Sequence, residues 1–257
     1  MLPGRPDAGG RARPPGAPST TAHSRAATAR PAMNHKDAET QRRGPVRNRP
    51  FLLCALVPLW FAVTAGAAET RTLLFFGDSL TAGYGLEDPA TGAFPARVQA
   101  KIADAGLPWH VVNAGLSGET SAGGCRRVDW ILRQRVDVFV LALGGNDGLR
   151  GIPPESTQAN LQTIIDQVRE KFPAATIVLA GIVAPPNMGA DFTRAFAGIF
   201  PELADKNHLP LIPFLLEGVA GRPGLNQADG IHPNEKGHAL VAETVWADLQ
   251  PLLADRH

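Results

Sequence analysis

The chain has 257 residues with nearly balanced charge, 25 Lys+Arg against 24 Asp+Glu. The balance is uneven: residues 1–67 hold 10 of the basic and 3 of the acidic residues, so the rest has 15 basic and 21 acidic residues and a formal charge of −6. The part of the chain after residue 67 is net acidic and has no basic stretch, which argues against nucleic-acid binding.

Residues 1–32 are rich in Arg, Pro, Ala and Gly without apolar periodicity, so we expect a disordered segment or a true start at residue 33. Residues 33–67 have the order of a secretory signal peptide: a basic stretch, an apolar run and the small residues Ala65-Gly66-Ala67. The run is short for a membrane span, with an uncleaved anchor as the alternative. We expect export, to a bacterial periplasm or beyond it, of a mature domain at 68–257.

After residue 68 the chain alternates short apolar runs with longer amphipathic segments. The apolar runs, which predict strands, are 72–76, 110–113, 136–143, 176–183 and 209–214. The segments that predict helices are 94–105, 121–133, 156–172, 192–207 and 235–253. Continuous Val, Leu and Ile runs are typical of strands buried on both faces. The pattern predicts one α/β domain, a three-layer α/β/α, flavodoxin-like doubly wound fold with a five-stranded parallel sheet.

The first predicted strand ends abruptly in Gly77-Asp78-Ser79, followed by small residues and glycines. Ligands of open α/β sheets bind at the carboxyl ends of strands, where Ser79 would stand. The alternative is that Asp78 and Ser79 only cap the next helix. The turn alone does not decide between the two.

Asp229 and His232 lie three residues apart among turn-forming residues near the other end of the chain. A serine becomes an effective nucleophile when a neutral imidazole takes its proton and a carboxylate holds the imidazole. An isolated Asp-x-x-His is more often a surface turn, but beside Gly-Asp-Ser it predicts a triad of Ser79, His232 and Asp229. His238, the rival base, is expected inside the last helix.

Donors for an oxyanion are expected at three successive strand ends. Gly115 closes the second strand, Asn146 follows the third, and the Ser79 N–H begins a helix. Taken singly, Gly115 is a turn glycine and Asn146 an Asx-turn residue. Together they predict an oxyanion hole of Ser79, Gly115 and Asn146, with Asp78 and Asp147 bracing the loops.

We expect no metal and no cofactor. His208, His232 and His238 do not stand at ligand spacing with cysteines or paired carboxylates. The glycine-rich loops lack the Gly-Lys-Ser/Thr of a phosphate cradle. Cys125 is the single cysteine after residue 67, so no intramolecular disulfide is possible there, and we expect it to pack in the core.

Four blocks, in this order, resemble the SGNH (GDSL) hydrolases and span nearly all of the chain after residue 68. They are Gly77-Asp78-Ser79-Leu80, residues 113–120, Gly144-Gly145-Asn146-Asp147 and Asp229 to His232. Residues 77–85 and 144–151 are most similar to the periplasmic thioesterase I/lysophospholipase/arylesterase branch. The resemblance implies a serine esterase at 68–257 that forms an acyl-enzyme, with the triad at the matching positions and aryl esters, acyl thioesters and lysophospholipids as substrates.

Two apolar loops, 148–154 and 182–188, are expected beside the oxyanion site, where they would hold an acyl chain or aromatic ring. They could equally well only cover the core. A carbohydrate O-acetylesterase shares the motifs but should have a polar, tryptophan-lined cleft, whereas Trp109, Trp130 and Trp246 fall outside the motif loops. A non-catalytic flavodoxin-like binding domain is the other alternative, in which Ser79, Asp229 and His232 need not converge.

Overall fold

The computed structural model describes residues 69–255, so the expected signal peptide at 33–67 and the segment 1–32 lie outside the described residues. Five parallel strands form one sheet in the order β2-β1-β3-β4-β5. The strands are β1 (Arg71–Gly77), β2 (Trp109–Gly115), β3 (Val138–Ala142), β4 (Thr176–Ala180) and β5 (Leu211–Ile212). This is the flavodoxin-like order, and it confirms the predicted fold class.

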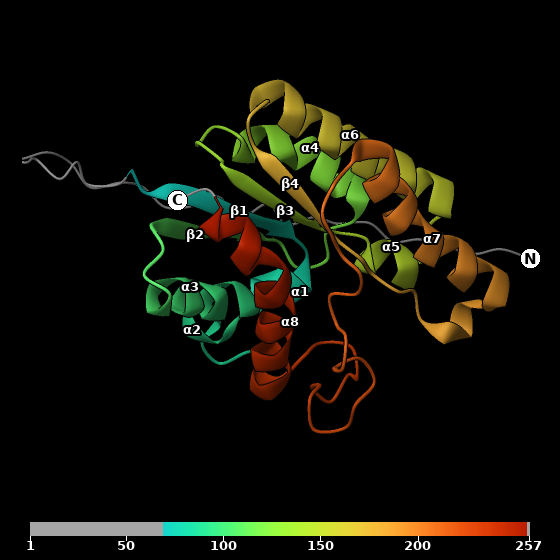
Figure 1. Ribbon diagram of the computed structural model, residues 1–257. Coiled ribbons are helices and arrows are strands. Elements are labelled where there is room, and N and C mark those ends of the chain that lie inside the picture. The colour runs from blue at the N-terminus through green and yellow to red at the C-terminus, as the bar shows by residue number, and fades with distance from the viewer. Residues whose placement is uncertain (1–68, 256–257) are drawn as a thin grey trace, which may run out of the picture. The chain divides into compact units, whose positions relative to one another are not determined.

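Helices cover both faces of the sheet (Figure 1). The helices are α1 (Ser79–Ala82), α2 (Pro89–Gly92), α3 (Phe94–Asp104), α4 (Ser121–Ile131), α5 (Gly145–Leu149), α6 (Pro154–Lys171), α7 (Ala190–Asn207) and α8 (Glu235–Ala254), with a 3-10 turn η1 (Pro186–Met188). On one face α3 packs against α8, and on the other α6 packs against both α4 and α7 (Figure 1). The five long helices are those predicted from the sequence.

The strands form where the sequence is continuously apolar. All five residues of β3 are buried, and Leu73 to Phe76 of β1 are 0% exposed. Strand β5 is shorter than the predicted 209–214, because Pro210 and Pro213 flank it and a proline cannot donate a ladder hydrogen bond. The central strands therefore form the most deeply buried layer of the domain.

Helix α6 shows how periodicity determines which side of a helix is buried. Leu161, Ile164, Ile165 and Val168 recur at helical spacing and are all 0% exposed. The last turn carries Arg169, which donates to both the side chain and the carbonyl of Asn207 on α7. One face of α6 thus packs on the sheet while its end is tied to the neighbouring helix.

The sheet topology creates a crevice at the carboxyl ends of β1 and β3, where a site can form. Strands β1 and β3 are neighbours, but the chain leaves them in opposite directions, toward β2 and β4. Such a switch point leaves a crevice at the carboxyl ends of the two strands, where α1 and α5 begin. Residues 213–234, which contain no helix or strand apart from one bridge between Asn226 and Pro233, connect β5 to α8.

Within residues 69–255, none of the helices combines the length and the apolar character needed to cross a bilayer.

Candidate active site

The turn after β1 is built by three residues with different tasks. A Cβ on Gly77 would lie 2.1 Å from Thr81 Oγ1 and 2.8 Å from the Ala142 carbonyl oxygen, so only glycine fits. Asp78 caps α1, its Oδ1 accepting the Leu80 N–H at 3.0 Å. Ser79 then stands as the first residue of α1, 8% exposed. Capping by Asp78 is therefore real and coexists with the presentation of Ser79 at the carboxyl edge of the sheet.

Ser79, His232 and Asp229 converge. Ser79 Oγ lies 2.9 Å from His232 Nε2, although the two residues are 153 positions apart. His232 Nδ1 lies 2.6 Å from Asp229 Oδ2. A non-catalytic binding domain gives no reason for this chain of two hydrogen bonds, whereas nucleophile activation requires it.

The protonation of Asp229 fixes the tautomer of His232. Desolvation raises the pKa of Asp229, but hydrogen bonds from the His232 ring and from the N–H groups of His232 and Ile231 outweigh it and lower the pKa to about 2. An ionised carboxylate only accepts, so His232 Nδ1 carries the proton when the ring is neutral. The Nε2 lone pair then faces the Ser79 hydroxyl and can accept its proton.

Gln227 holds the His232 loop against the turn after α1, a role that sequence reasoning missed. Its Nε2 donates to the carbonyls of Tyr84 at 2.6 Å and Pro233 at 3.0 Å, and its N–H donates to the His232 carbonyl at 2.8 Å. The Tyr84 ring centroid lies 4.7 Å from that of His232. The available signal was Gly85, because a Cβ at that position would lie 2.0 Å from Gln227 Oε1 and leave no room for the amide.

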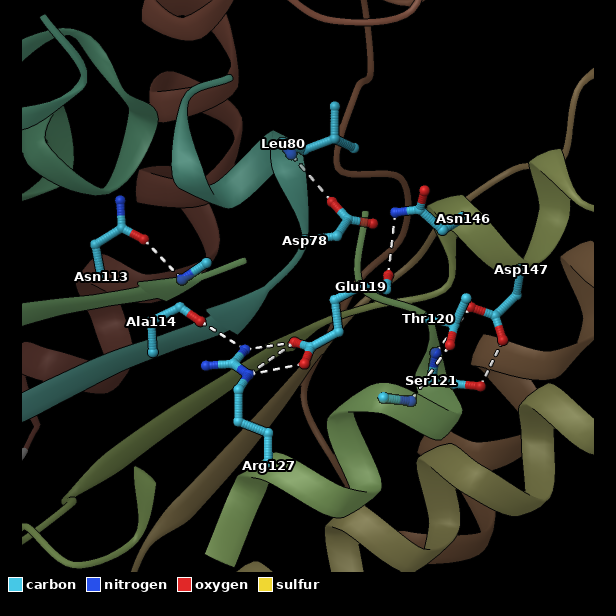
Figure 2. Close-up of polar contacts among 12 residues, drawn as sticks. Asp78, Leu80, Asn113, Ala114, Glu119, Thr120, Ser121, Arg127, Asn146 and Asp147 are labelled. Atoms are coloured by element: carbon cyan, nitrogen blue, oxygen red, sulfur yellow. Dashed lines mark hydrogen bonds and ion pairs between the residues drawn. The ribbon is translucent and has the colours of Figure 1, made fainter. Parts of the chain in front are cut away.

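Asn146 begins α5 at the end of β3. Its Nδ2 donates to the Glu119 carbonyl at 3.0 Å, which uses one of its two amide hydrogens (Figure 2). Among the described residues, the backbone N–H groups of Ser79 and Gly118 have no hydrogen-bond partner. Gly118 directly precedes Glu119, so these groups belong to the same edge of the sheet.

Gly115 is placed differently from our expectation. Its N–H donates to Asn113 Oδ1 at 3.0 Å, while Asn113 Nδ2 donates to the Thr81 carbonyl at 2.9 Å. A Cβ on Gly115 would lie 2.3 Å from the Ala82 nitrogen. Gly115 thus lets the end of β2 pack against α1, and its N–H is not offered to a ligand. The sequence signal for the alternative was the second glycine of the same block, Gly118. In the structure its φ is +80°, a left-handed conformation that favours glycine.

Asp147 and Asp78 brace the loops, as expected. Asp147 is 0% exposed and accepts from the Ser121 N–H at 2.8 Å and the Ser121 hydroxyl at 2.5 Å (Figure 2). It also accepts from the Thr157 hydroxyl at 3.3 Å, so it ties α5 to α4 and α6. Burial of Asp78 raises its pKa to about 6, an effect that the Leu80 N–H offsets only in part. Neither carboxylate is hydrogen-bonded to Ser79 or His232 in residues 69–255.

A partly buried ion pair fixes the loop between β2 and α4. Arg127 pairs with both carboxylate oxygens of Glu119 and donates to the Ala114 carbonyl at 2.9 Å (Figure 2). Its guanidinium also lies 4.3 Å from the centre of the Phe76 ring. A bidentate pair held this way orients the Glu119 backbone, and through it the Asn146 side chain.

An apolar hollow of about 310 Å³ opens beside Ser79 and Asn146. Its apolar lining includes Leu80, Leu149, Ile182, Val183, Ala184, Pro185, Pro186, Phe214, Leu216 and Ile231. The expected loop 182–188 contributes as predicted, but 148–154 does not form a loop throughout, because Leu149 ends α5 and Pro154 begins α6. None of Trp109, Trp130 and Trp246 lines this hollow, so it is not the polar tryptophan-lined cleft of the carbohydrate alternative.

The remaining candidates have structural roles. His238 in α8 accepts the Phe94 N–H on Nδ1 at 3.2 Å, and burial lowers its pKa to about 4, so it is a neutral core residue away from Ser79. Cys125 packs against the core and donates to the Asn160 carbonyl at 3.1 Å, and burial raises its pKa. No cluster of three His, Cys, Asp or Glu side chains in residues 69–255 is arranged to hold a metal ion.

Comparisons with known proteins agree with this arrangement. A family model described as the GDSL-like Lipase/Acylhydrolase family matches residues 75–240. The Pseudomonas aeruginosa protein named Esterase TesA is 40% identical over 206 residues, 80% of this chain and 100% of that protein. The Escherichia coli K12 protein named Thioesterase 1/protease 1/lysophospholipase L1 is 40% identical over 209 residues, 79% of this chain and 92% of that protein. A crystal structure of TesA is similar with a TM-score of 0.67 and 41% identity, covering 71% of this chain and 99% of that one.

Proposed function

The chain belongs to the GDSL-like lipase/acylhydrolase family, and from this premise we propose that it is a serine esterase that hydrolyses carboxylic ester and thioester bonds through Ser79, His232 and Asp229. The observation that carries the proposal is the 2.9 Å contact between Ser79 Oγ and His232 Nε2, continued by the 2.6 Å contact to Asp229. That sequence of contacts is the one an activated serine needs.

In the first half-reaction, Ser79 Oγ attacks the carbonyl carbon while its proton moves to His232 Nε2. The imidazolium that forms is stabilised by the ionised Asp229 carboxylate. His232 then gives the proton to the departing alcohol or thiol, which leaves an acyl ester on Ser79. Water, deprotonated by the same nitrogen, attacks that ester and releases the carboxylic acid and free Ser79.

The negative charge on the carbonyl oxygen needs hydrogen-bond donors that are already in place. We assign this role to the N–H groups of Ser79 and Gly118 and to the second amide hydrogen of Asn146. The two N–H groups have no partner within the described residues, and the hydrogen bond from Asn146 to Glu119 holds its amide beside them. Gly118 replaces Gly115 because the N–H of Gly115 is already bonded to Asn113.

The acyl group of the substrate fits the apolar hollow beside Ser79. With a volume of about 310 Å³, the hollow suits an alkyl chain or an aromatic ring. The names of the two relatives, an esterase and a thioesterase/lysophospholipase, point to the same substrate classes. We therefore propose aryl esters, acyl thioesters and lysophospholipids as substrates.

The proposal is tested by hydrolysis of p-nitrophenyl esters from acetyl to palmitoyl. We expect activity to peak at medium or long chains and the Ser79→Ala variant to lose at least about 1,000-fold in kcat. Ser156→Ala, which removes an exposed hydroxyl at the start of α6, is the matched control and should keep full activity. A fluorophosphonate probe should label the wild type and the control but not Ser79→Ala.

Two outcomes would change this assignment. Cleavage of the acetyl ester alone would favour a carbohydrate O-acetylesterase. Full activity in folded Ser79→Ala would remove Ser79 from the mechanism altogether.

We also propose that the enzyme is exported. The support is the sequence of residues 33–67, with its basic stretch, apolar run and small-residue cleavage pattern. Cleavage would leave the domain 68–257 in the periplasm, or outside the cell.

A further inference from the structure

A second hollow lies beside the oxyanion donors and has no role in the acyl-binding scheme above. It is an open cleft of about 620 Å³ between the loop 116–120 and the exposed side of α4. Three arginines line it, Arg126 and Arg127 from α4 and Arg150 from the end of α5, together with Trp130. We call it the arginine cleft.

The arginine cleft carries an unbalanced positive charge. Its single lining carboxylate, Glu119, is already paired with Arg127. Arg126 and Arg150 are exposed, and neither forms an ion pair within residues 69–255. The cleft therefore presents two guanidinium groups without a carboxylate partner in the described residues, although the formal charge of the chain after residue 67 is −6. Guanidinium groups are the preferred partners of phosphate oxygens.

The arginine cleft also adjoins the reacting atoms. Gly118 and Glu119 line it, and the Glu119 carbonyl lies 3.0 Å from Asn146 Nδ2. Asn146 in turn lines the apolar hollow together with Ser79. The two hollows therefore flank one set of carbonyl-binding groups. A substrate whose acyl chain fills the apolar hollow can extend its other half over Gly118 toward the arginines.

Arg150 contacts both the loop that carries the Gly118 oxyanion donor and the arginine cleft. Its guanidinium donates to the Gly118 carbonyl at 3.0 Å, which orients the loop that bears the Gly118 N–H. Only one of its donors is used in this contact, so others remain for a ligand. Trp130, 64% exposed, adds an apolar surface at the edge of the same cleft.

From this arrangement we infer that the arginine cleft binds a phosphate group on the leaving half of the substrate, with Arg126 and Arg150 as its ligands. The inference rests on the proposed esterase function. It adds that the enzyme prefers substrates whose leaving alcohol or thiol carries a phosphate group. A lysophospholipid headgroup and the phosphates of an acyl-coenzyme A share this chemistry.

The test compares substrates that differ in phosphate. Lysophosphatidate is matched with monoacylglycerol, and acyl-coenzyme A with the acyl-pantetheine thioester, all with the same acyl chain. For the wild type we expect kcat/KM to be about 10-fold higher for at least one phosphate-bearing member, since an exposed charge-assisted contact contributes modestly. The pair that shows the preference identifies which source of phosphate the cleft accepts.

Arg126→Gln should abolish that preference by raising KM for the phosphate-bearing substrate about 5- to 10-fold. It should leave kcat/KM for monoacylglycerol and p-nitrophenyl esters within two-fold, because Arg126 does not touch the oxyanion donors. Arg133→Gln is the matched control, an exposed arginine just beyond α4 that does not line the cleft. Arg150→Gln should lower kcat on all substrates, since it also releases Gly118.

Binding separates failure of this inference from failure of the esterase proposal. By calorimetry, Ser79→Ala protein should bind lysophosphatidate, acyl-coenzyme A or both more tightly than Ser79→Ala/Arg126→Gln protein does, whether or not the wild type hydrolyses them. Equal affinities of the two proteins for both ligands, or equal kcat/KM within both substrate pairs, would overturn the phosphate site. Hydrolysis of p-nitrophenyl esters would still stand in that case.

Discussion

At the scale of single residues, two buried ionisable side chains give the domain opposite responses to pH. Asp78 is 1% exposed and its pKa is raised to about 6, mainly by burial. His238 is 1% exposed and its pKa is lowered to about 4, again mainly by burial. Both side chains are therefore more stable as neutral groups inside the folded protein.

The sign of each contribution follows from proton linkage. The folded state holds the Asp78 proton more tightly than the unfolded state, so this contribution favours folding below pH 3.8 and is lost as the pH rises through about 6. The folded state holds the His238 proton less tightly, so its contribution is complete above pH 6.5 and is lost as the pH falls through about 4. Each contribution amounts to about 3 kcal/mol of the free energy of unfolding. In the wild type the two opposite pH dependences largely cancel between about pH 4 and about pH 6.

Substituting one of the two side chains at a time should reveal the pH dependence that each contributes to the free energy of unfolding. Relative to wild type, Asp78→Asn should gain about 3 kcal/mol in free energy of unfolding between pH 4 and pH 7, and His238→Asn should lose a similar amount over the same range. Asparagine preserves the acceptor for Leu80 N–H in the first case and can offer one to Phe94 N–H in the second. Urea unfolding at four pH values measures the differences.

Asp191→Asn, which alters a side chain 98% exposed, is the control and should give a flat difference. Flat differences for Asp78→Asn and His238→Asn as well would show that burial does not perturb the two groups.

At the scale of elements, the irregular segment 213–234 delivers His232 and Asp229 to the sheet edge. Side chains replace regular hydrogen bonding in this segment: Asn226 Nδ2 donates to the Val219 and Arg222 carbonyls, and Asn234 Nδ2 to the Gly224 carbonyl. Long loops without regular structure in a compact domain are commonly functional. Whereas the side-chain amides of these two asparagines donate within the segment, Gln227 connects the segment to the loop after α1 through the Tyr84 carbonyl.

We expect Gln227→Ala to lower kcat about 10- to 100-fold with little change in KM, because His232 would no longer be held in line with Ser79. The rate of fluorophosphonate labelling of Ser79 should fall in parallel. Steady-state kinetics and labelling rates on the purified variant measure both effects.

Gln99→Ala is the matched control. Gln99 also joins two backbone groups, donating to the Trp109 carbonyl at 3.2 Å and accepting from the Val111 N–H at 2.7 Å, but away from Ser79. It should lose stability and keep kcat. If both variants lose activity equally, Gln227 acts on stability and not on the position of His232.

At the scale of the whole molecule, the described domain contains every part of the proposed mechanism. The hydrophobic core runs from Leu73 to Leu253, and both hollows are lined by residues between 78 and 231. The proposed signal at 33–67 lies before all of them. Removal of the signal should therefore leave the fold and the activity unchanged.

We predict that expression of the full chain in a Gram-negative host yields a periplasmic protein that begins at Ala68. Intact-mass measurement on periplasmic and cytoplasmic fractions tests this. Ala67→Asp should block cleavage and leave the longer form, because signal peptidase requires a small residue there, whereas Ala62→Ser within the apolar run should be processed normally. A periplasmic protein that retains residues 33–67 would show an uncleaved anchor instead.

The sequence by itself determined the parallel α/β fold, the strand and helix positions, and the candidate residues Ser79, Asp229 and His232. These features are local: apolar runs and helical periodicity need only neighbouring residues, and Gly-Asp-Ser and Asp-x-x-His are short motifs. The sequence also predicted Gly115 as a backbone oxyanion donor and did not single out Gly118, and this prediction was wrong because the Gly115 N–H is bonded to Asn113.

Only the tertiary structure decided how these parts meet. The 2.9 Å contact between Ser79 and His232 depends on the path of residues 213–234, which have no periodicity to read. The choice against Gly115 depends on the Asn113 side chain, and the arginine cleft on the packing of α4 beside α5. Hydrogen-bond partners and clefts arise from distances between segments far apart in the chain, and a one-dimensional pattern carries no information about those distances.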